Sequence, residues 1–88
     1  MTETLPPYSQ VARSIVIGGT YEHYKGKCYK ILALARHSES LEELVVYQAL
    51  YGDGDIWVRP VSMFFENVNK SQPRFILLHL EEPVPKLR

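Results

Sequence analysis

The stretch LVVYQALYGDGDIWVR, residues 44–59, decides the fold of this 88-residue chain. Both of its halves are rich in β-branched and aromatic residues, and the Gly52-Asp53-Gly54-Asp55 segment between them is typical of a hairpin turn. A helix competes for the first half, because Ser40-Leu41-Glu42-Glu43 matches a capping box and Gly52 would end a helix of about three turns. The combined pattern favours strands, so we predict an antiparallel hairpin made of residues 44–51 and 56–59.

The length of the turn sets which side chains of this hairpin share a face. If Tyr51 pairs with Ile56, alternation along the strands creates a core face that consists of Tyr47, Ala49, Tyr51, Ile56 and Val58. The outward face then presents Gln48, Trp57 and Arg59.

A second hairpin is predicted upstream. Thr20 to Tyr24 and Lys27 to Arg36 are rich in strand formers, and Lys25-Gly26 between them suits a two-residue turn. Such a turn would place His23 opposite Cys28.

Pro60 cannot donate to a strand ladder, so the strand that begins at Ile56 should stop there. Val61 to Phe65 should then form a turn or a single helical turn, and Arg74 to Leu80 a last strand. Five or so antiparallel strands with one short helical turn predict an all-β fold, a small barrel or roll, over residues 18–80.

Two segments flank this predicted domain. The N-terminal extension, residues 1–17, contains Leu5-Pro6-Pro7 and then SQVARSIVI, which allows a short helix capped by Ser9 or an added strand. Residues 81–88, with two prolines, are expected to form a C-terminal tail.

Charge and cysteine content exclude several classes of protein. Ten basic and ten acidic residues cancel, and residues 1–44 and 45–88 each hold five of either kind, so non-specific nucleic-acid binding is not expected. Residues 23–37 carry four cations and no acid, which predicts one locally positive hairpin.

The single cysteine cannot form an internal disulfide, and the chain has no signal-peptide pattern and no apolar run of about 20 residues. We therefore expect a cytoplasmic protein without a membrane segment, whose small core leaves room for a homodimer.

Five segments of the chain follow one another in a familiar order: GTYEHYKG (residues 19–26), ARHSE (35–39), VYQALY (46–51), WVRP (57–60) and MF (63–64). They resemble the DUF1653 family, a set of short, mostly bacterial proteins that consist of a domain of unknown function. The resemblance covers about residues 19–76. It implies an SH3-like barrel, which supports strands at residues 44–51, and it implies no activity.

Two sets of residues could carry out catalysis. His23, His37 and Glu39 have the donor types that bind zinc, manganese or iron, but their spacing matches no metal motif, so ordinary hydrogen-bonded roles are favoured. Cys28 opposite His23 could be an activated thiolate, but nothing in the sequence supplies an oxyanion hole, so a half-buried thiol is favoured. We assign no catalytic residue, no metal and no cofactor.

Trp57 and Arg59 are the stronger functional signal. Two positions apart in a strand, they point the same way, and a ring beside a guanidinium can stack on a flat group and hold an anion. The alternative is that Trp57 fills the core while Arg59 pairs with a surface glutamate. Tyr21, Tyr24, Tyr29, Tyr47 and Tyr51 could line a groove, although a structural role is favoured for most of them.

The sequence therefore predicts a binding module rather than an enzyme. Its expected ligand is a small polar or anionic molecule, a nucleotide-like group or a peptide. The candidate binding residues are His23, Lys25, Arg36, His37, Glu39, Gln48, Trp57 and Arg59. The alternatives are a small or metal-dependent enzyme that uses His23, His37, Glu39 or Cys28, and a structural protein whose aromatic surface binds a larger partner.

Overall fold

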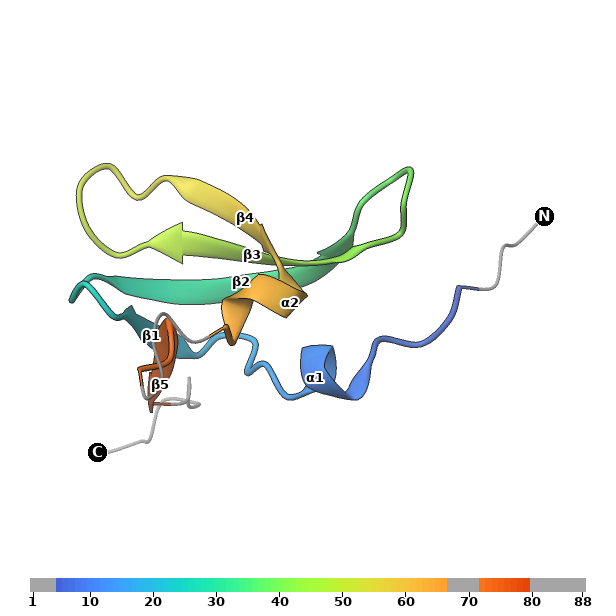
Figure 1. Cartoon of the computed structure of the whole chain (residues 1–88). Helices are drawn as coiled ribbons and strands as arrows, with labels where there is room; N and C mark the ends of the chain where they lie inside the picture. Colours follow the sequence, from blue (N-terminus) through green and yellow to red (C-terminus); the bar gives the residue numbers. More distant parts are fainter. Residues whose placement is uncertain (1–4, 67–71, 80–88) are drawn as a thin grey trace, which may run out of the picture.

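The computed structural model describes residues 5–66 and 72–79, and within them it contains five strands and two short helices (Figure 1). In chain order these are α1 (Gln10–Arg13), β1 (Thr20–His23), β2 (Cys28–Arg36), β3 (Glu43–Ala49), β4 (Ile56–Pro60), α2 (Val61–Phe64) and β5 (Phe75–His79). The strands form one antiparallel sheet in the order β4-β3-β2-β1-β5. The expected all-β fold with a helical turn after β4 is confirmed, and the sheet is not closed into a barrel because β4 and β5 are its two edges.

The long strand β2 joins the two halves of the sheet. Its register with β3 shifts between Ile31 and Ala33, and such a bulge bends a strand. In Figure 1, β2, β3 and β4 form one layer, while β1 and β5 turn away below it and α2 lies under the layer. The bend therefore creates a concave face.

The core fills this concave face. Along β3, Val45, Tyr47 and Ala49 are buried at alternate positions, which is the period of a strand with one face inward. Phe64 of α2 is fully buried and stacks on Phe75 of β5, with ring centroids 4.4 Å apart. α2 thus connects the two edges of the sheet through the core.

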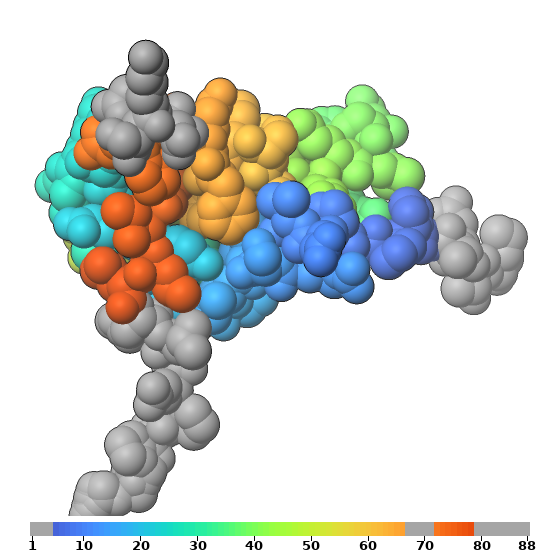
Figure 2. Space-filling view, turned by 60° about the horizontal axis from the view of Figure 1, so that its bottom comes forward, coloured from blue at the N-terminus to red at the C-terminus, as the bar shows by residue number. Residues whose placement is uncertain are grey.

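The N-terminal extension packs against this core as a helix, which decides between the two structures that the sequence allowed. The Ser9 hydroxyl accepts a hydrogen bond from the Ala12 N–H (3.1 Å) and so caps α1. The Ser9 N–H and hydroxyl also donate to the Glu43 carboxylate, at 2.6 and 2.7 Å. Ala12 and Ile15 belong to the buried core, and α1 lies beside α2 in Figure 2. The expected tail, residues 81–88, lies outside the described residues.

The turn between β1 and β2 is longer than predicted. The Gly26 N–H donates to the His23 carbonyl and the His23 N–H donates to the Lys27 carbonyl, both at 2.7 Å, which makes a three-residue loop. Gly26 has φ 96°, a left-handed conformation that glycine adopts without strain. Cys28 consequently pairs with Glu22 and not with His23, so the predicted pairing was wrong by one position.

The hairpin of β3 and β4 is confirmed, but its predicted register was wrong. Tyr47 pairs with Trp57, and the Ala49 N–H donates to the Asp55 carbonyl at 2.9 Å, so the loop is longer than the four residues expected. The shift is an odd number of positions, which moves every side chain of β4 to the other face. Trp57 and Arg59 therefore share the concave face with Tyr47, while Ile56 and Val58 lie on the convex face with Gln48.

Candidate functional site

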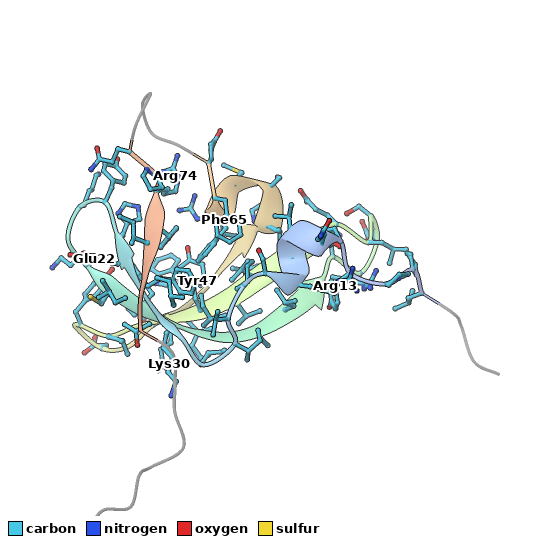
Figure 3. The ribbon with its side chains drawn as sticks, turned by 90° about the horizontal axis from the view of Figure 1, so that it is seen from below. Arg13, Glu22, Lys30, Tyr47, Phe65 and Arg74 are labelled. Atoms are coloured by element: carbon cyan, nitrogen blue, oxygen red, sulfur yellow. The ribbon has the colours of Figure 1, made fainter. Side chains whose placement is uncertain are left out.

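The candidate site lies where side chains of the edge strands β4 and β5 meet. We call this region the seam, and its residues are His23, Lys25, Arg59, Arg74 and Phe75. Arg59 of β4 lies with its guanidinium carbon 5.6 Å from the centroid of the Phe75 ring of β5. Its Nε donates to the Tyr47 hydroxyl at 3.3 Å, which fixes the direction of the guanidinium. Figure 3 shows Tyr47 near the middle of this concave face, with Arg74 farther toward one end. Within the described residues, the two terminal amino groups of Arg59 have no hydrogen-bond partner and no carboxylate.

Positive charge gathers around this guanidinium. Burial lowers the pKa of His23 below its usual 6.5, and the positive charges of Arg59, Arg74 and Lys25 lower this pKa further. Among the described residues, the one carboxylate in an ion pair here is that of Glu66, whose Oε1 lies 3.5 Å from an Arg74 amino group. The Nε of Arg74 is buried and has no partner in the described part of the chain, although buried donors are nearly always paired. The described residues of the seam therefore supply fewer hydrogen-bond acceptors and fewer negative charges than its donors and cations require.

Stability should fall as the pH drops below about 6.5, and His23→Gln should reduce this fall. The pKa of His23 is lower in the folded protein than in the unfolded chain, so the unfolded chain takes up a proton at a higher pH. Neutral His23 therefore contributes to the free energy of unfolding above pH 6.5, the usual pKa of the unfolded chain. This contribution is lost as the pH falls from 6.5 toward the pKa of His23 in the folded protein. Melting temperatures measured between about pH 7.5 and pH 5 would test this, since carboxylates titrate mainly below that window. An identical pH slope in the variant would contradict it.

Tyrosine rings form the floor of the site. Tyr29 packs edge-to-face on Tyr47, Tyr51 and Phe75, with centroids 5.2 to 5.8 Å apart. The Tyr29 and Tyr51 hydroxyls share a hydrogen bond of 2.5 Å. Burial, followed by this hydrogen bond, raises the pKa of Tyr29 to about 12, so its hydroxyl stays neutral near pH 7. The floor is aromatic and uncharged.

Trp57 lies two positions from Arg59 on the same face, at the edge of the sheet. The residue is 51% exposed, and within the described residues no aromatic ring packs on its ring. The alternative in which Trp57 fills the core does not hold. A large apolar ring is thus available beside the guanidinium.

The structure places the eight predicted binding residues in three different regions. His23, Lys25 and Arg59 lie at the seam, where the charges of Lys25 and Arg59 act on His23, and Trp57 lies two positions from Arg59 on β4. Gln48 lies on the convex face, where its amide donates to the Gly54 carbonyl at 3.0 Å and supports the β3–β4 loop. Arg36, His37 and Glu39 lie at or just beyond the far end of β2.

These last three residues have structural contacts at their own end. The Arg36 guanidinium packs 4.3 Å from the Tyr8 ring centroid and donates to the Pro6 carbonyl at 2.5 Å. The His37 Nδ1 accepts hydrogen bonds from the backbone N–H groups of Glu39 and Ser40, at 3.1 and 3.3 Å. They anchor the N-terminal segment and shape the β2–β3 loop, away from the seam.

The distance between these two ends of the sheet bears on the alternative in which His23, His37 and Glu39 form one metal or catalytic site. His23 and His37 are divided by the length of β2, roughly 25 Å at the usual rise of a strand. Within the described part of the chain, no three His, Cys, Asp or Glu side chains are placed to hold a metal ion.

In residues 5–66 and 72–79, no helix is long and apolar enough to cross a bilayer.

Sequence reasoning missed two contributors to the seam, Arg74 and Phe75. They precede and begin an ordinary apolar strand, and no motif marks them. Their position depends on the pairing of β5 with β1, in which Phe75 lies opposite His23.

Comparison with known proteins agrees with this fold. The model of a family described as "Protein of unknown function (DUF1653)" matches residues 19–77. A crystal structure of a DUF1653 protein from Bordetella bronchiseptica is similar to this chain, with 36% identity and a TM-score of 0.64. The similarity covers 76% of this chain and 92% of that chain. No curated protein matches the sequence. The chain belongs to the DUF1653 family.

Proposed function

We propose that this protein is a binding module for an anionic group, which it holds at the seam with Arg59. The observation that carries the proposal is the Arg59 guanidinium, which is oriented by Tyr47 and Phe75 while its terminal amino groups have no partner among the described residues. A guanidinium of fixed direction presents paired donors that suit a carboxylate or a phosphate.

The surrounding charges support the same ligand class. Arg74 and Lys25 act on His23 in the same direction as Arg59, so an anion at the seam would relieve repulsion among cations. The unpartnered Nε of Arg74 is a further donor close to this group of charges. Bound anion would also raise the pKa of His23, so binding should strengthen as the pH is lowered.

The shape of the site suits an anion that is part of a larger ligand rather than a free small molecule. No pocket is formed by the described residues, whereas small-molecule sites usually enclose most of their ligand. An open surface with an exposed Trp57 suits an anionic group that projects from a larger molecule and has an apolar or flat neighbour.

Phenyl phosphate should bind more tightly than inorganic phosphate, and phenol should not bind measurably. Arg59→Gln should weaken phenyl phosphate binding by about ten- to a hundredfold, the range for hydrogen bonds to a charged group. Calorimetric titration, with amide chemical shifts to locate the site, is the measurement.

Arg13→Gln is the matched control, because it removes the same charge from an exposed residue that Figure 3 shows away from Arg74, on the other side of the molecule. It should bind like the unmodified protein. Equal weakening in both variants would indicate a general charge effect and would contradict the proposal, as would shifts that appear only outside the seam.

A further inference from the structure

The outer edge of β4 is exposed and apolar. β4 is an end strand of the sheet, and Ile56, Trp57 and Val58 are 59%, 51% and 57% exposed. Natural sheet edges are usually protected by charges, by proline or by a covering segment, because they pair readily with other strands. In β4 such protection begins only at Arg59 and Pro60, the last two residues of the strand, and Ile56 to Val58 carry none.

The hydrogen-bonding pattern between β3 and β4 shows which backbone groups of β4 face its free edge. The Ala49 N–H donates to the Asp55 carbonyl, and in an antiparallel ladder such bonded pairs alternate with unbonded ones. The bonded pairs are therefore those of Asp55, Trp57 and Arg59 with β3. The N–H and carbonyl groups of Ile56 and Val58 point to the free edge, and no other described residue hydrogen-bonds to them from outside the sheet.

We propose that an extended acidic peptide pairs with the outer edge of β4 and places a carboxylate on Arg59. This inference rests on the proposed anion site and names its partner. The charge of the seam selects the ligand, because a strand added beside β4 would bring one of its side chains directly next to Arg59 on the concave face. Three positive charges, those of Arg59, Arg74 and Lys25, act on His23 here, while the carboxylate of Glu66 pairs with Arg74.

The two faces of β4 then predict the pattern of the peptide. Peptide residues opposite Val58 and Ile56 lie on the convex face, against exposed apolar side chains. The peptide residue opposite Arg59 is acidic, and the residue opposite Trp57 can lie against its ring. An acidic residue followed by an apolar, a variable and an apolar one fits the edge in antiparallel orientation.

The test uses the peptide acetyl-Thr-Glu-Val-Thr-Val-Thr-amide and two methylated forms. Methylating the nitrogens of both valines removes the donors that would face β4, and should weaken binding by about tenfold or more. Methylating the glutamate and the middle threonine instead alters nitrogens that face away from β4, and should leave the affinity unchanged. Replacing the glutamate with glutamine should also weaken binding, because Arg59 loses its anion.

On the protein, Val58→Pro removes an outward N–H without removing a bond of the β3–β4 ladder. This variant should lose the peptide while it binds phenyl phosphate as before, which separates the edge from the anion site. If the variant fails to fold, the two methylated peptides provide the same distinction.

Three results would overturn the inference. The peptide could bind equally well whichever nitrogens are methylated, it could fail to bind while phenyl phosphate binds, or β4 could pair with a second copy. The last would appear in sedimentation as a dimer that the peptide does not dissociate and that Val58→Pro abolishes. Failure of both phenyl phosphate and the peptide would count against the anion site itself.

Discussion

Phe64→Ala should lower the free energy of unfolding by about 3–5 kcal/mol, the usual cost of removing a fully buried phenyl ring. Phe64 has no exposed surface and stacks on Phe75 with an angle of 7° between the rings. It also meets Tyr21 and Tyr47 edge-to-face, with centroids 5.1 and 6.3 Å away. One side chain of a four-residue helix thus links β1, β3 and β5, and the open sheet has no ladder that could replace it.

Urea unfolding followed by fluorescence and circular dichroism would measure this loss. Phe65→Ala is the matched control, because the neighbouring ring is partly exposed and packs against Phe64 from outside the core. It should cost about 1 kcal/mol or less. Equal losses in the two variants would show that α2 does not hold the halves of the sheet together in this way.

Ala12→Asp should destabilise the protein by about 3 kcal/mol or more, because it buries a carboxylate without a partner. Ala12 has no exposed surface and lies in the core cluster with Ile15 and Phe64. This prediction concerns a segment outside the family match, which begins at residue 19. A large effect would show that the N-terminal helix is part of the stable domain.

Val11→Asp provides the comparison on the same helix, since Val11 is half exposed. The variant should change the unfolding free energy by about 0.5 kcal/mol or less, and thermal unfolding of both proteins gives the difference. Similar stability of the two variants would mean that α1 does not depend on its contact with the core.

The strands were predictable because their local signals agree with one another. β-branched and aromatic residues fill β3 and β4, Gly52 and Gly54 adopt the positive φ angles of a turn, and Pro60 ends β4. The capping-box pattern at Ser40 to Glu43 did not produce a helix, because β3 gains two neighbouring strands and a buried face. Tertiary packing outweighed the local helix signal there.

The registers were not predictable, because both faces of β4 carry large apolar side chains. Ile56 and Val58 would suit a core as well as Trp57 does, so hydrophobic alternation does not decide which face is inward. The decision depends on the loop, where one additional residue in a turn reverses the faces of the following strand. The same effect at Gly26 separated Cys28 from His23.

Part of the candidate site was predictable. Trp57 and Arg59 point the same way in any register, because they are two positions apart in one strand. The distance between His23 and His37 depends on the length and bend of β2, which the residue types do not reveal. The contact of Arg36 with Tyr8 was equally hidden, since it joins a strand end to an irregular segment.

The pairing of β5 with β1 has a consequence for the order of folding. This ladder brings His23 against Phe75, whereas the β1–β2, β2–β3 and β3–β4 ladders each join neighbours in the chain. Closing so long a loop costs more conformational entropy than closing a hairpin, so we expect β5 to join a preformed β1–β4 meander and to detach from it first. Phe75 leaves the Arg59 guanidinium whenever β5 detaches, so the proposed anion site loses the ring that helps to orient this group. An anion that bound Arg59 and Arg74 together would therefore hold β5 against the meander.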